Sequence, residues 1–268
     1  MNKTFYFLVT LLVAAFFTAS AQSVNNEYPR KIENTSFQRG ENLTYRVYYD
    51  SWLTAWMTAG YGTMKIQDDP VMIDERETYH IIIEGISAGM FNWFFKVRDR
   101  FETYMDVESM APLKFIRRTR EGNYVKDDDV IFDHVELYAQ SRNKKKPIPR
   151  YVQDIVSAFY YFRNVDFDTA EVNDEFFLDF YLDDSVYYSK VIFDGREKIK
   201  TDFGELMCMR FKPQVAVGEV FQQTYPMVLW VSDDKNKIPV MAKSGVFIGS
   251  VTIELQEYAN LRYPLGQK

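Results

Sequence analysis

The sequence predicts a mainly β protein, built on a large curved antiparallel sheet that forms an open barrel or half-barrel and carries one short helix. Three observations support this prediction. Apolar and polar residues alternate in about a dozen segments, which is the period-2 pattern of half-buried strands. The turns between these segments are short, as neighbouring antiparallel strands allow. Only residues 152–163 place their apolar side chains at the spacing of a helical face.

The first two predicted strands show the alternation clearly. Every second residue from Leu43 to Tyr49 is apolar or aromatic, so these side chains are expected to share one face. The next segment, residues 54–67, continues in the same style. It contains Gly60 and Gly62, which predict a bulge or a close approach of two backbones.

Residues 94–107 alternate more regularly than any other segment, but Asp99 and Thr103 fall on its apolar side. Either these two residues form a polar spot inside the protein, or a bend turns them outward. The bend is the favoured interpretation, because burial of unpaired polar groups is costly.

The rest of the chain follows the same pattern. Further strands are predicted at residues 77–86, 113–120, 124–138, 176–183, 186–194, 198–203, 206–212 and, after a turn at 243–245, 246–257. No linker rich in proline, glycine or serine divides the chain. We therefore expect one domain over residues 37–263, preceded by a flexible leader at residues 22–36.

The predicted helix, residues 152–163, is expected to pack against one end of the sheet. Asp154 suits the positive end of the helix dipole and Arg163 the negative end. These two residues are expected to fix the helix to the sheet rather than to contact a ligand. With Ser157 and Asp233 they form the set of candidate structural polar residues.

The first 21 residues have the features of a secretory signal peptide. Lys3 precedes an apolar run at residues 5–17, and small residues at 19–21 mark a cleavage site after Ala21. The alternative, a membrane anchor, would need a longer run of about 20 apolar residues. No cysteine lies near the cleavage site, so a lipoprotein is not expected. These features predict a free, periplasmic protein.

Charge and cysteine content narrow the function classes. The chain of 268 residues has a net charge of −6, which argues against binding to nucleic acid or to anionic membrane surfaces. Cys208 is the sole cysteine, so no internal disulfide can form. Its apolar neighbours predict a buried small hydrophobic residue rather than a nucleophile.

Several motifs recur in an order typical of one family. They are Phe37 with Gly40–Tyr45, Asp154 with Ser157–Arg163, Trp230–Asp233 with Ile238–Val240, and Gly249–Ser250. Together they resemble the domain-of-unknown-function family 3108, a family of exported proteins from Gram-negative bacteria. The resemblance implies a single periplasmic domain with a strongly curved antiparallel sheet, and it implies no activity.

Catalytic chemistry finds little support in the sequence. The only histidines, His80 and His134, lie in predicted strands and are expected to be satisfied by hydrogen bonds, which leaves no base for a triad and too few ligands for zinc. The paired aspartates at 127–129, 183–184 and 233–234 occupy predicted turns, where aspartate usually binds its own backbone. We therefore expect no enzyme, no cofactor and no metal, and a carboxylate-dependent glycan hydrolase is the least favoured function.

Aromatic residues make up 17% of the chain, and a curved sheet with an aromatic concave face would suit acyl chains or sugar rings. The candidate ligand-binding residues are those of the densest cluster, Trp52, Trp56, Phe91, Trp93 and Phe95. The alternative, that the aromatic residues simply fill a thick core, is slightly favoured. The sequence thus suggests binding of a lipid or glycolipid of the cell envelope, and alternatively a structural or assembly partner of an envelope protein complex.

Overall fold

The predicted fold class is confirmed. The computed structural model describes residues 30–51, 56–142, 144–214, 226–245 and 249–267, and in these residues one antiparallel sheet of 15 strands contains most of the chain and does not close into a barrel. The elements are β1 (Asn42–Asp50), β2 (Met57–Ile66), β3 (Val71–Ile73), β4 (Arg76–Ser87), α1 (Phe91–Phe94), β5 (Arg98–Asp106), β6 (Pro112–Glu121), β7 (Tyr124–Asp133), β8 (Tyr138–Gln140), β9 (Lys145–Pro147), α2 (Ile155–Phe162), β10 (Glu175–Leu182), β11 (Ser185–Thr201), β12 (Gly204–Pro213), β13 (Met227–Ser232), β14 (Pro239–Gly245) and β15 (Ser250–Ala259).

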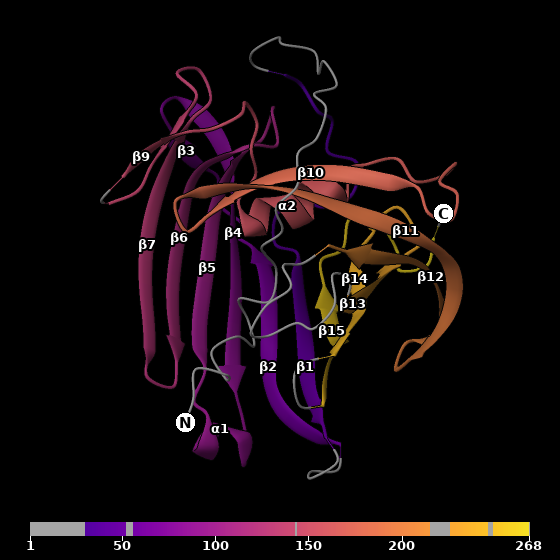
Figure 1. Cartoon of the computed structure of the whole chain (residues 1–268). Coiled ribbons are helices and arrows are strands. Elements are labelled where there is room, and N and C mark those ends of the chain that lie inside the picture. The colour runs from indigo at the N-terminus through magenta and orange to yellow at the C-terminus, as the bar shows by residue number, and fades with distance from the viewer. Residues whose placement is uncertain (1–29, 52–55, 143, 215–225, 246–248, 268) are drawn as a thin grey trace.

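The sheet consists of two runs of antiparallel strands, which meet where the first strand pairs with the last. Its order is β10-β11-β12-β13-β14-β15-β1-β2-β4-β5-β6-β7-β8-β9, with β3 paired to β4. The pairing of β1 with β15 joins the two halves. In Figure 1 the sheet bends so that β4 to β7 form one wall and β12 to β15 the other, while β10 and α2 lie across one end.

The alternation that predicted the first strand corresponds to an inner and an outer face. Leu43, Tyr45 and Tyr49 of β1 are buried on the concave side. The predicted close approach at Gly60 is also confirmed, because a Cβ atom there would clash with the carbonyl oxygen of Ile86 in β4. A register shift between Val47 and Tyr48 lies opposite this point.

Several predicted boundaries differ from the structure. The helix predicted at 152–163 is 155–162, because Asp154 caps its start, and the strand predicted at 124–138 ends at Asp133 before a turn at 134–137. β11 is one long strand rather than two, because Gly195, at a φ of 102°, accommodates a bulge without ending the pairing to β12. Residues 91–94 form the single turn α1, so β5 begins only at Arg98. Residues 243–245, predicted as a turn, belong to β14, and the last strand is 250–259 rather than 246–257.

The interpretation of Asp99 and Thr103 as turned outward is wrong. Both side chains are buried on the inner face of β5. Their polar atoms are accommodated because Asp99 accepts a hydrogen bond from the backbone N–H of Arg120, at 2.9 Å, and Thr103 donates one to Asp154, at 2.5 Å. The inner polar spot is therefore real.

The ordered chain extends beyond the predicted limits at both ends. Ser36, assigned to the flexible leader, is fully buried, and its hydroxyl donates to the carbonyl of Arg163 at 2.6 Å. At the other end, the N–H of Gly266 donates to Asp234 at 2.7 Å. The predicted signal peptide, residues 1–21, lies outside the described residues.

Cys208 is buried as predicted, with no exposed surface. Burial raises the pKa of its thiol to about 12, so the thiolate that a nucleophile requires is not formed at neutral pH.

Candidate ligand cavity

Helix α2 is fixed at its start by a capping box. The carboxylate of Asp154 accepts hydrogen bonds from the N–H groups of Val156 and Ser157 at 2.7 and 2.8 Å, and the Ser157 hydroxyl accepts one from the N–H of Asp154 at 2.9 Å. The second carboxylate oxygen of Asp154 accepts the hydroxyl of Thr103 in β5. The cap therefore ties the helix to the inner face of the sheet.

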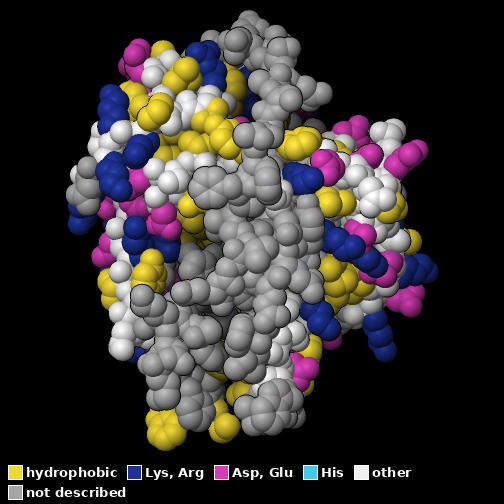
Figure 2. Space-filling view, in the orientation of Figure 1, with side chains coloured by type: hydrophobic (Ala, Val, Ile, Leu, Met, Phe, Trp, Pro, Cys, Tyr) yellow, Lys and Arg dark blue, Asp and Glu magenta, His cyan; other side chains and the backbone are white. Residues whose placement is uncertain are grey.

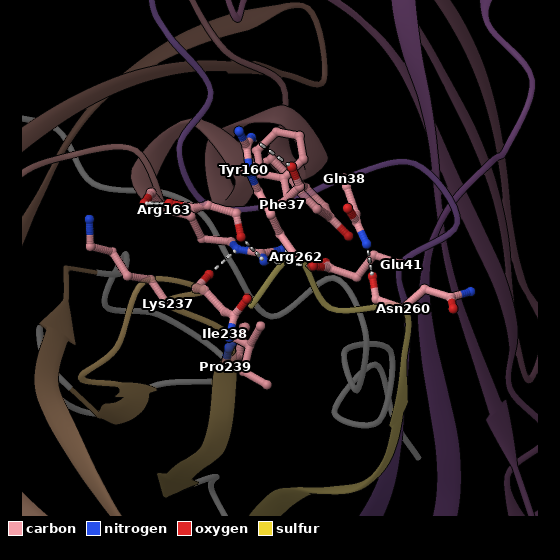
Figure 3. A network of polar contacts seen from close by, with 12 residues as sticks. Phe37, Gln38, Glu41, Tyr160, Arg163, Lys237, Ile238, Pro239, Asn260 and Arg262 are labelled. Atoms are coloured by element: carbon pink, nitrogen blue, oxygen red, sulfur yellow. Dashed lines mark hydrogen bonds and ion pairs between the residues drawn. The ribbon is translucent and has the colours of Figure 1, made fainter. Parts of the chain in front are cut away.

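The other end of α2 is fixed by a buried ion pair, shown in Figure 3. The guanidinium of Arg163 donates to both oxygens of Glu41 at 2.6 and 2.8 Å, and to the carbonyl of Asn236 at 2.9 Å. Burial alone would lower the pKa of Arg163, but Glu41 outweighs it and the pKa is raised. These contacts link the helix to the chain entering β1 and to the β13–β14 connection.

Asp233, the fourth candidate structural residue, lies apart from the helix ends. Its side chain is buried and forms an ion pair with Arg196 of β11 at 3.4 Å.

The concave side of the sheet and one face of α2 enclose a cavity of about 290 Å³. Its apolar wall includes, from the sheet, Tyr45, Val47, Met64, Ile83, Phe101, Phe180, Leu229 and Ile253 and, from the helix, Ile155, Val156, Phe159 and Phe162. Among the described lining residues the polar ones are Thr63, Glu84, Ser87, Ser189, Gln214 and Ser244. A cavity with this lining favours an apolar occupant that offers few hydrogen bonds.

Glycines make room for the cavity on β2 and β4. Gly62 and Gly85 are direct partners in the register of these strands, and both lie in the cavity wall with Gly60. Gly62 also pairs with Tyr45 of β1, and a Cβ atom on Gly62 would make only ordinary contacts, 3.6 Å or longer. The wall is therefore hollow here because these positions carry no side chains.

The structure brings together only part of the predicted aromatic cluster. Phe91 lies in the cavity wall, and the ring of Phe95 packs edge-on against it with centroids 6.5 Å apart. Trp93 faces solvent, and Trp56 stacks on Tyr48 at 4.9 Å, away from the cavity wall. Trp52 lies outside the described residues.

Aromatic residues that the cluster did not include contribute more of the wall. Phe159 and Phe162 belong to α2, and Phe180 to β10. The helical periodicity of residues 152–163 could have identified Phe159 and Phe162, because the apolar face of a helix that packs on a concave sheet must cover the interior of that sheet. Other aromatic residues fill the core, as the alternative interpretation expected: Phe167, Phe193 and Phe211 form a cluster of their own.

A cluster of buried polar side chains lies on the inner face of β5 and β6. Asp99 and Glu121 interact through a hydrogen bond between their side chains, and burial raises the pKa of Asp99 despite this bond. Arg117, also fully buried, donates to Thr119 at 3.1 Å and to Asp183 in the β10–β11 turn at 3.2 Å. This contact holds the β10–β11 turn against the opposite wall.

The histidines are satisfied, as predicted. Nε2 of His134 donates to the carbonyl of Pro112 at 2.8 Å, and Nδ1 accepts the N–H of Tyr151 at 3.2 Å. His80 contacts Glu102 at 2.7 Å. Within the described ranges, no three His, Cys, Asp or Glu side chains are arranged to hold a metal ion.

The paired aspartates also have local partners. Asp127 pairs with Arg120 at 2.7 Å, and Asp234 accepts the N–H groups of Asn236 and Lys237, both at 3.0 Å. Asp234 thus binds the backbone as turn aspartates do. The prediction that residues 127–129 occupy a turn is wrong, because these aspartates lie within β7 and pair with β6.

One solved structure with low sequence identity shares the fold, and two others match with lower scores. A β-barrel-like protein of the domain family DUF1849 from Brucella abortus matches with a TM-score of 0.54 and 10% identity, over 85% of this chain and 100% of that chain. A candidate lipoprotein from Parabacteroides distasonis matches with a TM-score of 0.37 and 10% identity, over 86% of this chain and 99% of that one. A candidate exported protein with a YmcC-like fold from Bacteroides fragilis matches with a TM-score of 0.34 and 11% identity, over 86% of this chain and 99% of that one.

No curated protein matches the sequence. In the part of the chain that the structure describes, no helix is both long and apolar enough to cross a membrane. A family profile described as "Protein of unknown function (DUF3108)" matches residues 44–256, which is most of the chain. The chain therefore belongs to the DUF3108 family, as its motifs predicted.

Proposed function

We propose that this protein is exported to the periplasm and binds an apolar or amphiphilic component of the cell envelope, a lipid or glycolipid, in the cavity between the sheet and α2. The observation that carries the proposal is the cavity itself, about 290 Å³ in volume and lined mainly by aliphatic and aromatic side chains. Apolar cavities of only ~150 Å³ already bind small hydrophobic molecules. Export is supported by the signal-peptide features of residues 1–21.

The contacts of the charged residues favour a binding protein over an enzyme. Asp127 of β7 is held by Arg120, Asp234 accepts backbone N–H groups, and His134 uses both ring nitrogens in structural hydrogen bonds. A catalytic acid or base must instead reach the bound substrate. We therefore assign the chain no reaction and expect no turnover of the bound molecule.

Filling the cavity tests this proposal. Gly62→Leu would place a side chain inside the wall, where the added Cβ makes no contact shorter than 3.6 Å, so the variant should fold. The matched control is Gly245→Leu, because a Cβ there meets open space. Delipidated protein would be titrated with a fluorescent fatty acid and a fluorescent phospholipid, and thermal unfolding would verify the fold of each variant.

We expect saturable binding by the wild type and Gly245→Leu, and binding at least about tenfold weaker by Gly62→Leu. Equal affinities for all three proteins would show that the cavity is not the site. No saturable binding of either probe by the wild type would contradict the proposed function.

A further inference from the structure

One end of the molecule exposes large apolar side chains next to the cavity. At α1, Met90 and Trp93 are 69% and 86% exposed, while Phe91 between them is buried in the cavity wall. Figure 2 shows hydrophobic side chains at the end of the molecule where Figure 1 places α1. The same short helix therefore contacts both the interior and the solvent.

The exposed apolar surface continues onto neighbouring strands. Ile86, at the end of β4, is 45% exposed, and its partner on β2 in the sheet register, Tyr61, is 38% exposed. Trp56, directly before β2, is 50% exposed. We call Trp56, Ile86, Met90 and Trp93 the apolar tip.

Two exposed basic side chains lie beside the apolar tip. Lys96, between α1 and β5, and Arg98, the first residue of β5, are both exposed, and Arg98 is the register partner of Ile86. On the outer face, the guanidinium of Arg46 lies 6.0 Å from the ring centre of Tyr61. The nearby acid Glu84 is already paired with Arg100 at 2.6 Å.

We propose that the apolar tip docks on the surface of a lipid bilayer, with its apolar side chains among the headgroups and acyl chain ends and with Lys96 and Arg98 against anionic headgroups. Tryptophan favours this interface because its ring is apolar and its N–H is polar. The inference rests on the proposed function, since Phe91 connects the docked end with the lipid cavity.

The net negative charge of the chain, which argued against anionic membranes, does not oppose this docking. Charges act over about 8 Å at physiological ionic strength, so the residues near the bilayer decide the interaction. Next to α1 these residues include Lys96 and Arg98, and the nearby carboxylate of Glu84 is paired with Arg100.

Vesicle co-sedimentation tests the docking. Purified protein would be mixed with vesicles of phosphatidylethanolamine and phosphatidylglycerol. The double variant Met90→Ser/Trp93→Ser should bind about tenfold more weakly than the wild type or worse, because it removes two interfacial apolar groups. The matched control is Val172→Ser/Phe177→Ser, which removes two other apolar residues, 58% and 65% exposed, and should bind like the wild type.

A second pair of measurements separates this inference from the proposed function. The fluorescent fatty acid, dissolved without vesicles, should bind equally well to the wild type and to Met90→Ser/Trp93→Ser. Lys96→Gln/Arg98→Gln should weaken binding only to vesicles that contain phosphatidylglycerol. Intact fatty-acid binding without any vesicle binding, or equal loss in the apolar-tip and control variants, would overturn the docking and leave the cavity proposal standing.

Discussion

The carboxylate of Glu41 and the guanidinium of Arg163 form a buried bidentate ion pair, with N–O distances of 2.6 and 2.8 Å. Glu41 has no exposed surface and Arg163 is 3% exposed. The pair joins the chain entering β1 to the end of α2, so it holds the helix that covers the cavity.

Arg163→Met should strongly destabilise the fold, because it leaves the Glu41 carboxylate buried without its cation. The expected loss is about 3–5 kcal/mol in the free energy of unfolding, measured by urea denaturation. Lys198→Met is the control, since its pair with Glu205 is exposed and should contribute at most about 1 kcal/mol. The double variant Glu41→Leu/Arg163→Met should regain part of the loss. Similar losses of unfolding free energy in Arg163→Met and Lys198→Met would contradict this account.

Asp154 should make the protein less stable as the pH rises. Burial raises its pKa from 3.8 to about 6, although hydrogen bonds from Thr103 and the backbone of Ser157 and Val156 lower it. The folded state thus holds this proton more tightly than the unfolded chain. Stability should fall between about pH 4 and pH 6, by about 3 kcal/mol from this group, and stay lower above that range.

Asp154→Asn isolates this effect, because asparagine keeps an acceptor for the two helix N–H groups and does not titrate. The urea midpoint of the variant, measured at several pH values, should lack the decrease that Asp154 causes. A variant whose pH profile parallels that of the wild type would show that Asp154 does not titrate in this range.

His134 should make the protein less stable as the pH falls, the opposite of the effect of Asp154. Burial lowers its pKa from 6.5 to about 4, so the unfolded chain takes up a proton more readily than the folded protein. Its contribution to stability should be complete above about pH 6.5 and be lost as the pH falls toward 4, by about 3 kcal/mol. His134→Gln retains a donor and an acceptor, and its stability should vary less over this range. An unchanged acid slope in that variant would refute the assignment.

Most of the strands were predictable because half-buried strands impose a period of two on the sequence, and a slip by one residue would expose the whole inner face. The continuity of β11 was not predictable. Gly195 interrupts the alternation as a strand end would, and only the pairing with β12 shows that the strand continues through a bulge.

The candidate site was predicted only in part, for a geometric reason. In a strand, Phe91, Trp93 and Phe95 would share a face, but residues 91–94 form a helical turn. Helical spacing places residues 91 and 95 together and turns residue 93 away, as observed. The hollow at Gly62 and Gly85 depends on strand register, which joins residues far apart in the sequence and cannot be seen in a local pattern.

Asp99 offers a last test, because a buried acid on the inner wall is costly to keep ionised. Burial raises its pKa, so the folded state favours the protonated form and the ionised form weakens the fold at neutral pH. Asp99→Asn keeps an acceptor for the N–H of Arg120. It should therefore raise the urea midpoint at pH 7, whereas the control Asp127→Asn, at an exposed ion pair between β6 and β7, should change stability by no more than about 0.5 kcal/mol. A lower midpoint for Asp99→Asn would mean that the charge of Asp99 stabilises the inner wall.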